Sequence, residues 1–384
     1  MINNEKDNLK AGIYVHVPFC TKKCKYCSFY SIEDKRFEDY LKLIEKSIDS
    51  AKIKLPLTDS IYFGGGTPSL LPPEYIDAVL NKINSKFNIS DDTEITLELN
   101  PGTIDEVYFK KLLKTGVNRL NIGVQSFSDK NLKLLGRIHS SKKAVETYFN
   151  ARHTGFSNIG LDLIYGIPKQ SEKELFSDLE FMVSLKPEHI SAYMLTLEKN
   201  TPFYLMSENK EIFMPSEELL SSFFLKVLRF FGSNGYKFYE ISNYAVSEKY
   251  FSRHNQKYWN LNPYLGFGPS AHSFVNNKRW SEPSSFDIWS SNILNSENKG
   301  VFYEETDIVQ QKTEFIFLGL RTKKGIDSLR YKKFFNEDFF KKFDVLIQEY
   351  LKKNLLEISG DFLFLSEKGF LFSDYISLKF IENI

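Results

Sequence analysis

Short apolar runs alternate with amphipathic stretches along the first 235 residues of the chain. In one amphipathic stretch, apolar residues recur at the i, i+3, i+4 spacing of a helix face: Phe37, Tyr40, Leu41, Ile44 and Ile48. A second such stretch begins at Pro72, and Gly116 and Gly155 follow two others, where glycine commonly ends a helix. The apolar runs predict six strands: Gly12–Val17, Ser60–Phe63, Glu94–Leu99, Arg119–Gly123, Asn158–Ile164 and His189–Met194.

This alternation predicts an α/β fold over residues 1–235, with a parallel sheet covered by helices. Six strand–helix units are enough for a closed or partly closed barrel, and we expect a partial (β/α)6 barrel. Ligands of such folds bind at the carboxyl ends of the strands. The cysteines of the chain come directly after the first expected strand, at that end.

The alternation fails beyond about Tyr236. Residues 236–306 read as a loop-rich segment with many aromatic side chains. Residues 307–384 then predict three helices and a hairpin-like pair of strands, in the order Gln311–Leu320, Tyr331–Phe335, Phe340–Lys353, Leu356–Ser359 and Phe362–Leu365. Helices followed by a small hairpin predict a smaller, mainly helical, winged-helix-like C-terminal domain.

Composition describes a globular protein, with 42% hydrophobic and 26% charged residues. A formal net charge of +1 argues against broad attraction to nucleic acid or to an acidic membrane. The start of the chain carries acidic residues and no apolar core, unlike a signal peptide, and no run approaches the length of a membrane span. We therefore expect a cytoplasmic protein. Its 35 Phe and 21 Tyr leave room for an aromatic pocket that holds a flat ligand.

All three cysteines, Cys20, Cys24 and Cys27, lie within eight residues at C-x3-C-x2-C spacing. A disulfide framework would leave one cysteine over, and a structural zinc site normally needs four protein ligands, so zinc would have to recruit a residue such as His16. Three thiolates favour a [4Fe–4S] cluster whose fourth iron has no protein ligand and can bind a small molecule. The zinc site stays as the alternative.

Glycines and polar residues follow the other expected strands. The run Gly64-Gly65-Gly66-Thr67 comes after the second strand, where it forms either a tight turn or a surface on which backbone groups approach a ligand closely. The later strand ends and the loops behind them carry Glu98, Gln125, Arg137 and Asp162. An acid within Leu-Asp-Leu-Ile is costly to bury without a partner, so we expect Asp162 to face a site.

The cysteine spacing, with an aromatic residue before the last cysteine, resembles the cluster loop of the radical S-adenosylmethionine (SAM) superfamily. Further motifs resemble its coproporphyrinogen III dehydrogenase-like branch over nearly the whole chain: Tyr-Val-His-Val-Pro-Phe-Cys, Gly-Gly-Gly-Thr-Pro, Gly-Val-Gln-Ser-Phe, Leu-Gly-Arg-Ile-His and Asp-Leu-Ile-Tyr-Gly-Ile-Pro. The resemblance implies that the three cysteines hold the cluster and that the open iron chelates SAM. The positions implied for SAM are Tyr14, Tyr26, Gly65, Gly66, Thr67, Glu98, Gln125, Arg137 and Asp162.

Two kinds of protein in this branch differ at features that the sequence shows. The dehydrogenase, an oxygen-independent oxidase of coproporphyrinogen III, has a fourth cysteine two residues after the third and a longer N-terminal segment. Here Phe29 takes that position and 19 residues precede Cys20. The HemW-type haem chaperones have a His-Asn-x-x-Tyr-Trp motif, which this chain matches with His254, Asn255, Tyr258 and Trp259.

The resemblance therefore implies a haem chaperone that passes haem to haem-requiring proteins such as respiratory enzymes, and a homodimer is its candidate oligomeric form. Imidazole is a usual axial ligand of haem iron, so we expect His254 to bind the iron, with His272 as a second candidate. The alternative for His254 is a loop histidine with a satisfied hydrogen bond beside core aromatics. The alternative function is the coproporphyrinogen III dehydrogenase. The net charge disfavours a radical SAM enzyme that acts on RNA.

Overall fold

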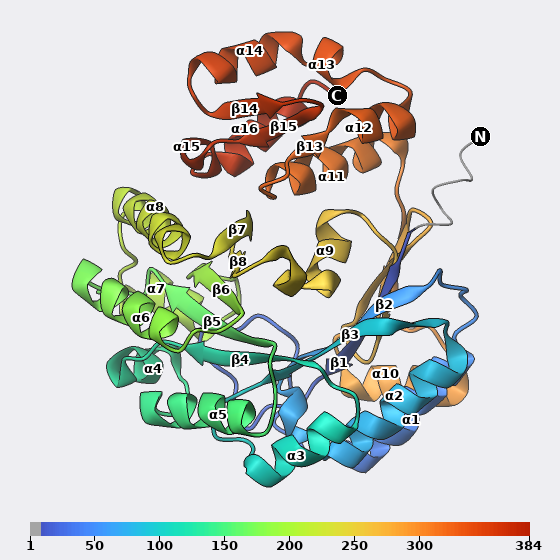
Figure 1. Cartoon of the computed structure of the whole chain (residues 1–384). Coiled ribbons are helices and arrows are strands. Elements are labelled where there is room, and N and C mark those ends of the chain that lie inside the picture. The colour runs from blue at the N-terminus through green and yellow to red at the C-terminus, as the bar shows by residue number, and fades with distance from the viewer. Residues whose placement is uncertain (1–8) are drawn as a thin grey trace.

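The computed structural model describes residues 9–384, and within them twelve strands form one mixed sheet (Figure 1). The strand order is β12-β11-β10-β9-β1-β2-β3-β4-β5-β6-β8-β7. The six strands at its centre are mutually parallel: β1 (Ala11–Val17), β2 (Thr58–Gly65), β3 (Ile89–Leu99), β4 (Arg119–Gln125), β5 (Ile159–Tyr165) and β6 (His189–Met194). These strands confirm the six that the sequence predicts.

Helices connect the parallel strands and cover the outer side of the sheet (Figure 1). The predicted apolar face of the first helix is confirmed, because Tyr40, Ile44 and Ile48 are buried against the core. The helices between β1 and β7 are α1 (Phe37–Ser50), α2 (Pro73–Lys86), α3 (Glu106–Lys114), α4 (Asp129–Leu135), α5 (Ser141–His153), α6 (Glu172–Ser184), α7 (Pro202–Glu208) and α8 (Glu217–Ser233), with a 3-10 turn at Pro68–Leu70.

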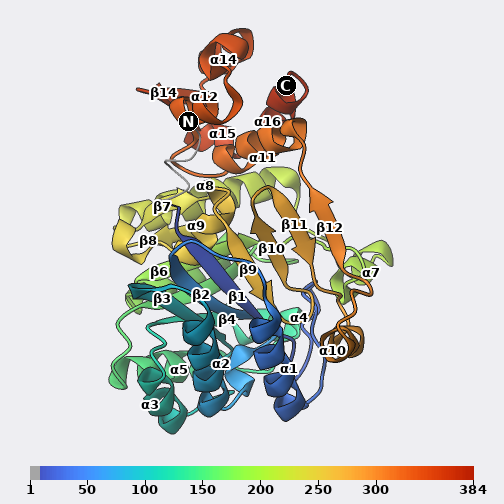
Figure 2. The ribbon, with the colours of Figure 1, turned by 90° about the vertical axis from the view of Figure 1, so that its right-hand side faces the viewer.

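The barrel is open, as predicted. β1 pairs with β9 and β6 pairs with β8, so β1 and β6 do not meet (Figure 2). The residues that extend the sheet come from segment 236–306: β7 (Lys237–Glu240), β8 (Asn243–Ala245), β9 (Tyr264–Phe267), β10 (His272–Val275), β11 (Lys278–Ser281), β12 (Phe302–Glu305), α9 (Arg253–Trp259), α10 (Phe286–Asn295) and a 3-10 turn at Glu248–Tyr250. This segment holds more regular structure than its sequence suggests, and two of its strands, β9 and β8, are placed by pairing with β1 and β6 of the barrel.

The C-terminal segment packs above the barrel in Figure 1. Its elements are α11 (Ile308–Leu320), β13 (Ile326–Asp327), α12 (Ser328–Phe335), α13 (Phe339–Lys342), α14 (Asp344–Lys352), β14 (Leu356–Ser359), β15 (Phe362–Leu365), α15 (Glu367–Phe370) and α16 (Ser373–Ile381). The predicted hairpin is confirmed to the residue, whereas the helix expected over 340–353 is interrupted at Phe343. The domain boundaries at 235 and 306 stay predictions. Within residues 9–384, no helix is long and apolar enough to cross a membrane.

Candidate functional site

The segment after β1 forms a closed loop, which we call the cysteine loop (residues 18–32). Two backbone hydrogen bonds close it: Cys20 N–H donates to the Ile32 carbonyl at 2.9 Å, and Ile32 N–H donates to the Pro18 carbonyl at 2.7 Å. The middle of the loop is held from outside. Lys25 N–H donates to Leu135 O at the end of α4 (3.1 Å), and Phe203 N–H of α7 donates to Lys25 O (2.9 Å). The cysteines therefore sit on a backbone that protein contacts fix at both ends and in the middle.

The loop covers one end of a cavity of about 420 Å³ at the carboxyl ends of the parallel strands. Nearly all residues that the sequence singled out for the cluster and SAM line this cavity: Cys20, Cys24, Tyr26, Cys27, Gly65, Gly66, Thr67, Glu98, Gln125, Arg137 and Asp162. Tyr14 does not line it. Its hydroxyl is 3.2 Å from His16 Nδ1, and its ring stacks against Tyr62 and His254 deeper in the barrel.

A chain of polar side chains connects two of the cysteines. Thr67 Oγ1 lies 3.6 Å from Cys20 Sγ and accepts a hydrogen bond from Asn100 Nδ2 at 2.8 Å. Arg137 donates to Asn100 Oδ1 at 2.5 Å through one terminal nitrogen and to Cys24 Sγ at 3.4 Å through the other. The Arg137 guanidinium therefore lies directly beside Cys24 Sγ, one of the three sulfurs expected to hold the cluster.

The glycine run needs glycine for steric reasons. Gly65 has a φ of +104°, a conformation that L side chains rarely adopt. A Cβ atom at Gly66 would fall 2.5 Å from the Phe19 carbonyl oxygen, so the strand end and the cysteine loop could not approach each other as they do. The backbone of this turn is thereby exposed to the cavity without side chains in between.

Two acids on the cavity wall have raised pKa values. Burial raises the pKa of the Glu98 carboxyl to about 7, although Tyr62 donates a hydrogen bond to it at 2.6 Å. Burial also raises the pKa of Asp162, whose two oxygens accept from Asn121 Nδ2 at 2.9 and 2.8 Å. These carboxyls are acceptors for polar hydroxyls of a ligand, such as those of a ribose.

The donor set fits a polynuclear cluster better than one metal ion. His16, which a zinc site would recruit, is 3% exposed, and its ring nitrogens bond to the Tyr14 hydroxyl and the Tyr30 carbonyl. An iron–sulfur cluster instead takes thiolates on separate iron atoms. Arg137 Nε, close to the cysteines, is a buried polar atom that has no hydrogen-bond partner in the protein.

Sequence reasoning missed three polar contributors to this wall. Asn100 bridges Thr67 and Arg137, Asn121 holds Asp162, and Tyr62 holds Glu98. Asn121 carries a detectable signal, since it is a polar residue inside the apolar strand Arg119–Gln125, as Asp162 is in its strand. The roles of the other two depend on contacts across strands that no local pattern shows.

The His-Asn-x-x-Tyr-Trp motif lies on α9, which packs against β1 and β2 near Gly12 and Ser60. His254 is 1% exposed, and both ring nitrogens are hydrogen-bonded: Nδ1 lies 3.2 Å from Ser60 Oγ and Nε2 lies 2.9 Å from the Tyr258 hydroxyl. Burial lowers the pKa of His254 to about 3, so its imidazole is neutral. Trp259 lines a separate small cavity beside α11. The backbone N–H of Asn255 donates to Ser252 Oγ.

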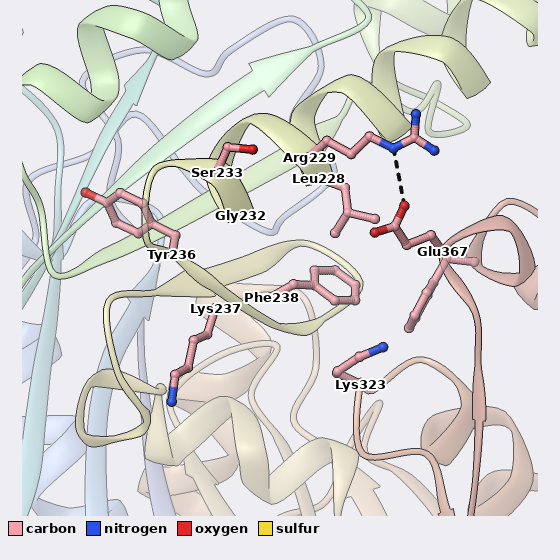
Figure 3. Close-up of a pocket in the computed structure, with 10 residues that line it drawn as sticks. Leu228, Arg229, Gly232, Ser233, Tyr236, Lys237, Phe238, Lys323 and Glu367 are labelled. Atoms are coloured by element: carbon pink, nitrogen blue, oxygen red, sulfur yellow. Dashed lines mark hydrogen bonds and ion pairs between the residues drawn. The ribbon is translucent and has the colours of Figure 1, made fainter. Parts of the chain in front are cut away.

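A second cavity, of about 530 Å³, lies between the barrel and the C-terminal segment (Figure 3). It is bounded by α8, β7 and α15, and Arg229 of α8 donates to Glu367 of α15 across it at 3.2 Å. None of the residues that the sequence singled out lines this cavity. The cavity beneath the cysteine loop is therefore the candidate functional site.

Comparison with known proteins gives two family matches. Residues 14–182 match the radical SAM superfamily, and residues 310–372 match the HemN C-terminal domain. A heme chaperone HemW of Bacillus subtilis (strain 168) is 32% identical over 379 residues, covering 97% of this chain and 99% of its own length. A heme chaperone HemW of Buchnera aphidicola subsp. Schizaphis graminum is 39% identical over 269 residues, covering 69% of this chain and 70% of its own.

The fold is also that of a solved structure. The coproporphyrinogen III oxidase HemN of Escherichia coli, described as a radical SAM enzyme, superposes with a TM-score of 0.83 over 100% of this chain and 92% of its own. At 20% sequence identity this match shows the shared fold.

Proposed function

This chain belongs to the HemW family of radical SAM proteins, and on that premise we propose that it is a haem chaperone, which binds haem and passes it to haem-requiring proteins. The observation that carries the proposal is similarity over nearly the full length, 97% of this chain, to a protein named as a heme chaperone. The radical SAM match to residues 14–182, with its three cysteines on one cavity, supports a cluster and SAM in the same protein.

We assign the [4Fe–4S] cluster to Cys20, Cys24 and Cys27. When bound, the cluster supplies an iron with an open position at which SAM is chelated. The chain's own residues position SAM: Arg137 offers a guanidinium to its carboxylate, while Glu98 and Asp162 offer acceptors to its hydroxyls. The Gly65–Gly66 backbone lets the ligand approach closely. Tyr14 lies outside the cavity, so its contribution would pass through His16 and Tyr62.

Haem is the cargo, and the sequence expects the α9 motif to hold it through His254. In the structure this imidazole is closed off, because Ser60 and Tyr258 occupy both ring nitrogens. For His254 to bind iron, its bond to Tyr258 must break and α9 must move away from β1 and β2. We further propose a cytoplasmic location, respiratory enzymes as acceptors and a homodimer as the working form.

The runner-up is the oxygen-independent coproporphyrinogen III dehydrogenase. Phe29, at the position of that enzyme's fourth cysteine, supplies no thiolate and is 65% exposed at the cavity rim. Product analysis separates the two functions. Formation of protoporphyrinogen together with 5′-deoxyadenosine from coproporphyrinogen would refute a purely carrier role.

An anaerobic haemin titration of the cluster-reconstituted protein, followed in the Soret band, tests the chaperone. Saturable binding near one haem per chain, followed by transfer to an apo haem protein, is the expected result. Absence of saturable binding would refute the proposal. The His254→Ala variant tests the ligand separately, since an unchanged spectrum and affinity would exclude His254 while leaving the function intact.

A further inference from the structure

Only two of the six imidazoles of this chain are open to a ligand. His16, His139, His189 and His254 are each 9% exposed or less. Each of these four has at least one ring nitrogen bonded to a protein group. His153 and His272 are exposed. Since haem iron needs a free nitrogen lone pair, these two are the imidazoles that can ligate it without a rearrangement of the protein.

The two exposed histidines have different surroundings. His153 is at the end of α5, in the outer helix layer, where its ring stacks on Phe149. His272 is the first residue of β10, in the part of the sheet that continues past β1. Its ring makes no hydrogen bond to any residue of the described part of the chain, 9–384. From β10 the sheet continues through β9 to β1, which carries Tyr14 and His16 and leads into the cysteine loop.

One row of side chains crosses the sheet face at His272, next to a row that carries Arg279 and Glu304. His272 pairs with Ser281 of β11, and Ser281 pairs with Phe302 of β12, so the three side chains share one face in a row across the strands. At about 4.8 Å per strand, Phe302 lies about 10 Å from His272. Phe302 is 53% exposed. Ser281, between His272 and Phe302, has a short side chain that leaves space above the sheet. A planar ring lying on this row would have an imidazole under its centre and a phenyl ring under its edge.

The cavity beneath the cysteine loop does not offer haem an equivalent place. Its volume of about 420 Å³ is in the lower part of the range for a single ligand of drug size, and its wall is assigned to the cluster and SAM. Haem therefore needs a surface of its own. The face of β10–β12 continues the inner face of β1, the strand that leads into the cysteine loop.

We propose that His272 is the axial ligand of haem iron, with the macrocycle lying on the β10–β12 face over Ser281 and against Phe302. This inference deepens the proposed function and rests on it. Neither a partner residue nor a movement of α9 is required for the first binding event. The lowered pKa of His272, caused by partial burial and by Arg279, keeps its imidazole neutral, as a metal ligand must be.

The test is the haemin titration repeated with four variants of the reconstituted full chain. His272→Ala should weaken binding about tenfold or more and remove the spectral signature of histidine ligation. His272→Met should keep binding but shift the Soret band, because a thioether replaces the imidazole. Phe302→Ser should weaken binding and leave the ligation signature unchanged. His153→Ala, the other exposed histidine beside an aromatic ring, is the matched control and should bind as the wild type does.

The outcomes distinguish failure of the His272 assignment from failure of the proposed haem chaperone function. Wild-type binding that His272→Ala leaves unchanged in affinity and spectrum would overturn the ligand assignment and leave the chaperone intact. The same holds if His254→Ala alone removes the histidine signature. Failure of the wild type to bind haemin would overturn both. A misfolded His272→Ala protein is recognised by loss of its cluster absorbance, and His272→Met then decides.

Discussion

The Glu98→Gln variant should change how the stability of the cofactor-free protein depends on pH. Glu98 is on β3 inside the barrel, where burial raises the pKa of its carboxyl from 4.5 to about 7. Glutamine keeps the shape and still accepts the hydrogen bond that Tyr62 donates at 2.6 Å. It cannot ionise. The substitution therefore removes one proton equilibrium and leaves the packing nearly as it is.

Proton linkage gives the direction and the size of the effect of pH on the free energy of unfolding. Between pH 4.5 and about 7, this carboxyl is charged in the unfolded chain and protonated in the folded one, so unfolding releases a proton. The free energy of unfolding of the wild type must then fall as the pH rises. The difference between the two pKa values corresponds to about 3 kcal/mol. Because Glu98 lines the open cavity, solvent can screen its charge, so we expect a loss of about 1–3 kcal/mol, complete above pH 7.

The assay is urea unfolding of both proteins at several values from pH 5 to 8, followed by tryptophan fluorescence. Other buried acids, such as Glu240, titrate in both proteins, so the wild-type minus variant difference isolates Glu98. The free energy of unfolding of the wild type should therefore fall relative to that of Glu98→Gln as the pH rises. Glu357→Gln, which changes an exposed glutamate on β14, controls for the loss of an acid. A difference between wild type and Glu98→Gln that stays constant within about 0.5 kcal/mol over this range would refute the reasoning.

Three further predictions concern the cluster and the ion pairs. Cys24→Ala should abolish the iron–sulfur absorbance after anaerobic reconstitution, and retention of a full cluster would contradict the ligand set. Lys257→Met should lower the free energy of unfolding by about 3–5 kcal/mol, because it leaves Asp59 as a buried charge without its partner at 2.5 Å; a loss below about 1 kcal/mol would show that water reaches the pair. Arg229→Ala should cost less than about 1 kcal/mol in the same measurement, since both side chains of its pair with Glu367 are exposed, and a larger cost would make that contact a true link between barrel and C-terminal segment.

Much of the fold was readable from local patterns. The strand His189–Met194 and the hairpin strands Leu356–Ser359 and Phe362–Leu365 were predicted to the residue, because apolar runs bounded by turn residues signal strands directly. The strands of 236–306 were missed, and length alone is not the reason, since the predicted hairpin strands are as short. For β9 the partner is distant: it pairs with β1, about 250 residues earlier in the chain, and no local window contains both.

The candidate site was predictable as far as strand ends could place it. Glu98, Gln125 and Asp162 are predicted from their places along the strands and from the family resemblance, and all three line one cavity. The state of His254 was not predictable. One of its partners, Tyr258, lies four residues away on the same helix, but the other, Ser60, lies on β2, 194 residues away. Whether a histidine in a motif is open or closed depends on such contacts.

The backbone hydrogen bonds of the cysteine loop determine what happens to the fold when the cluster is lost. In a zinc finger, binding of the metal drives folding, so loss of the metal unfolds the chain. Here Ile32, Leu135 and Phe203 hold the loop through bonds that involve no metal. If oxygen destroyed the cluster, the cysteine loop would keep its conformation, with the thiols still facing the cavity. The same polypeptide could then be refilled by cluster-assembly machinery, and oxidative damage would be repaired by reloading instead of by new synthesis.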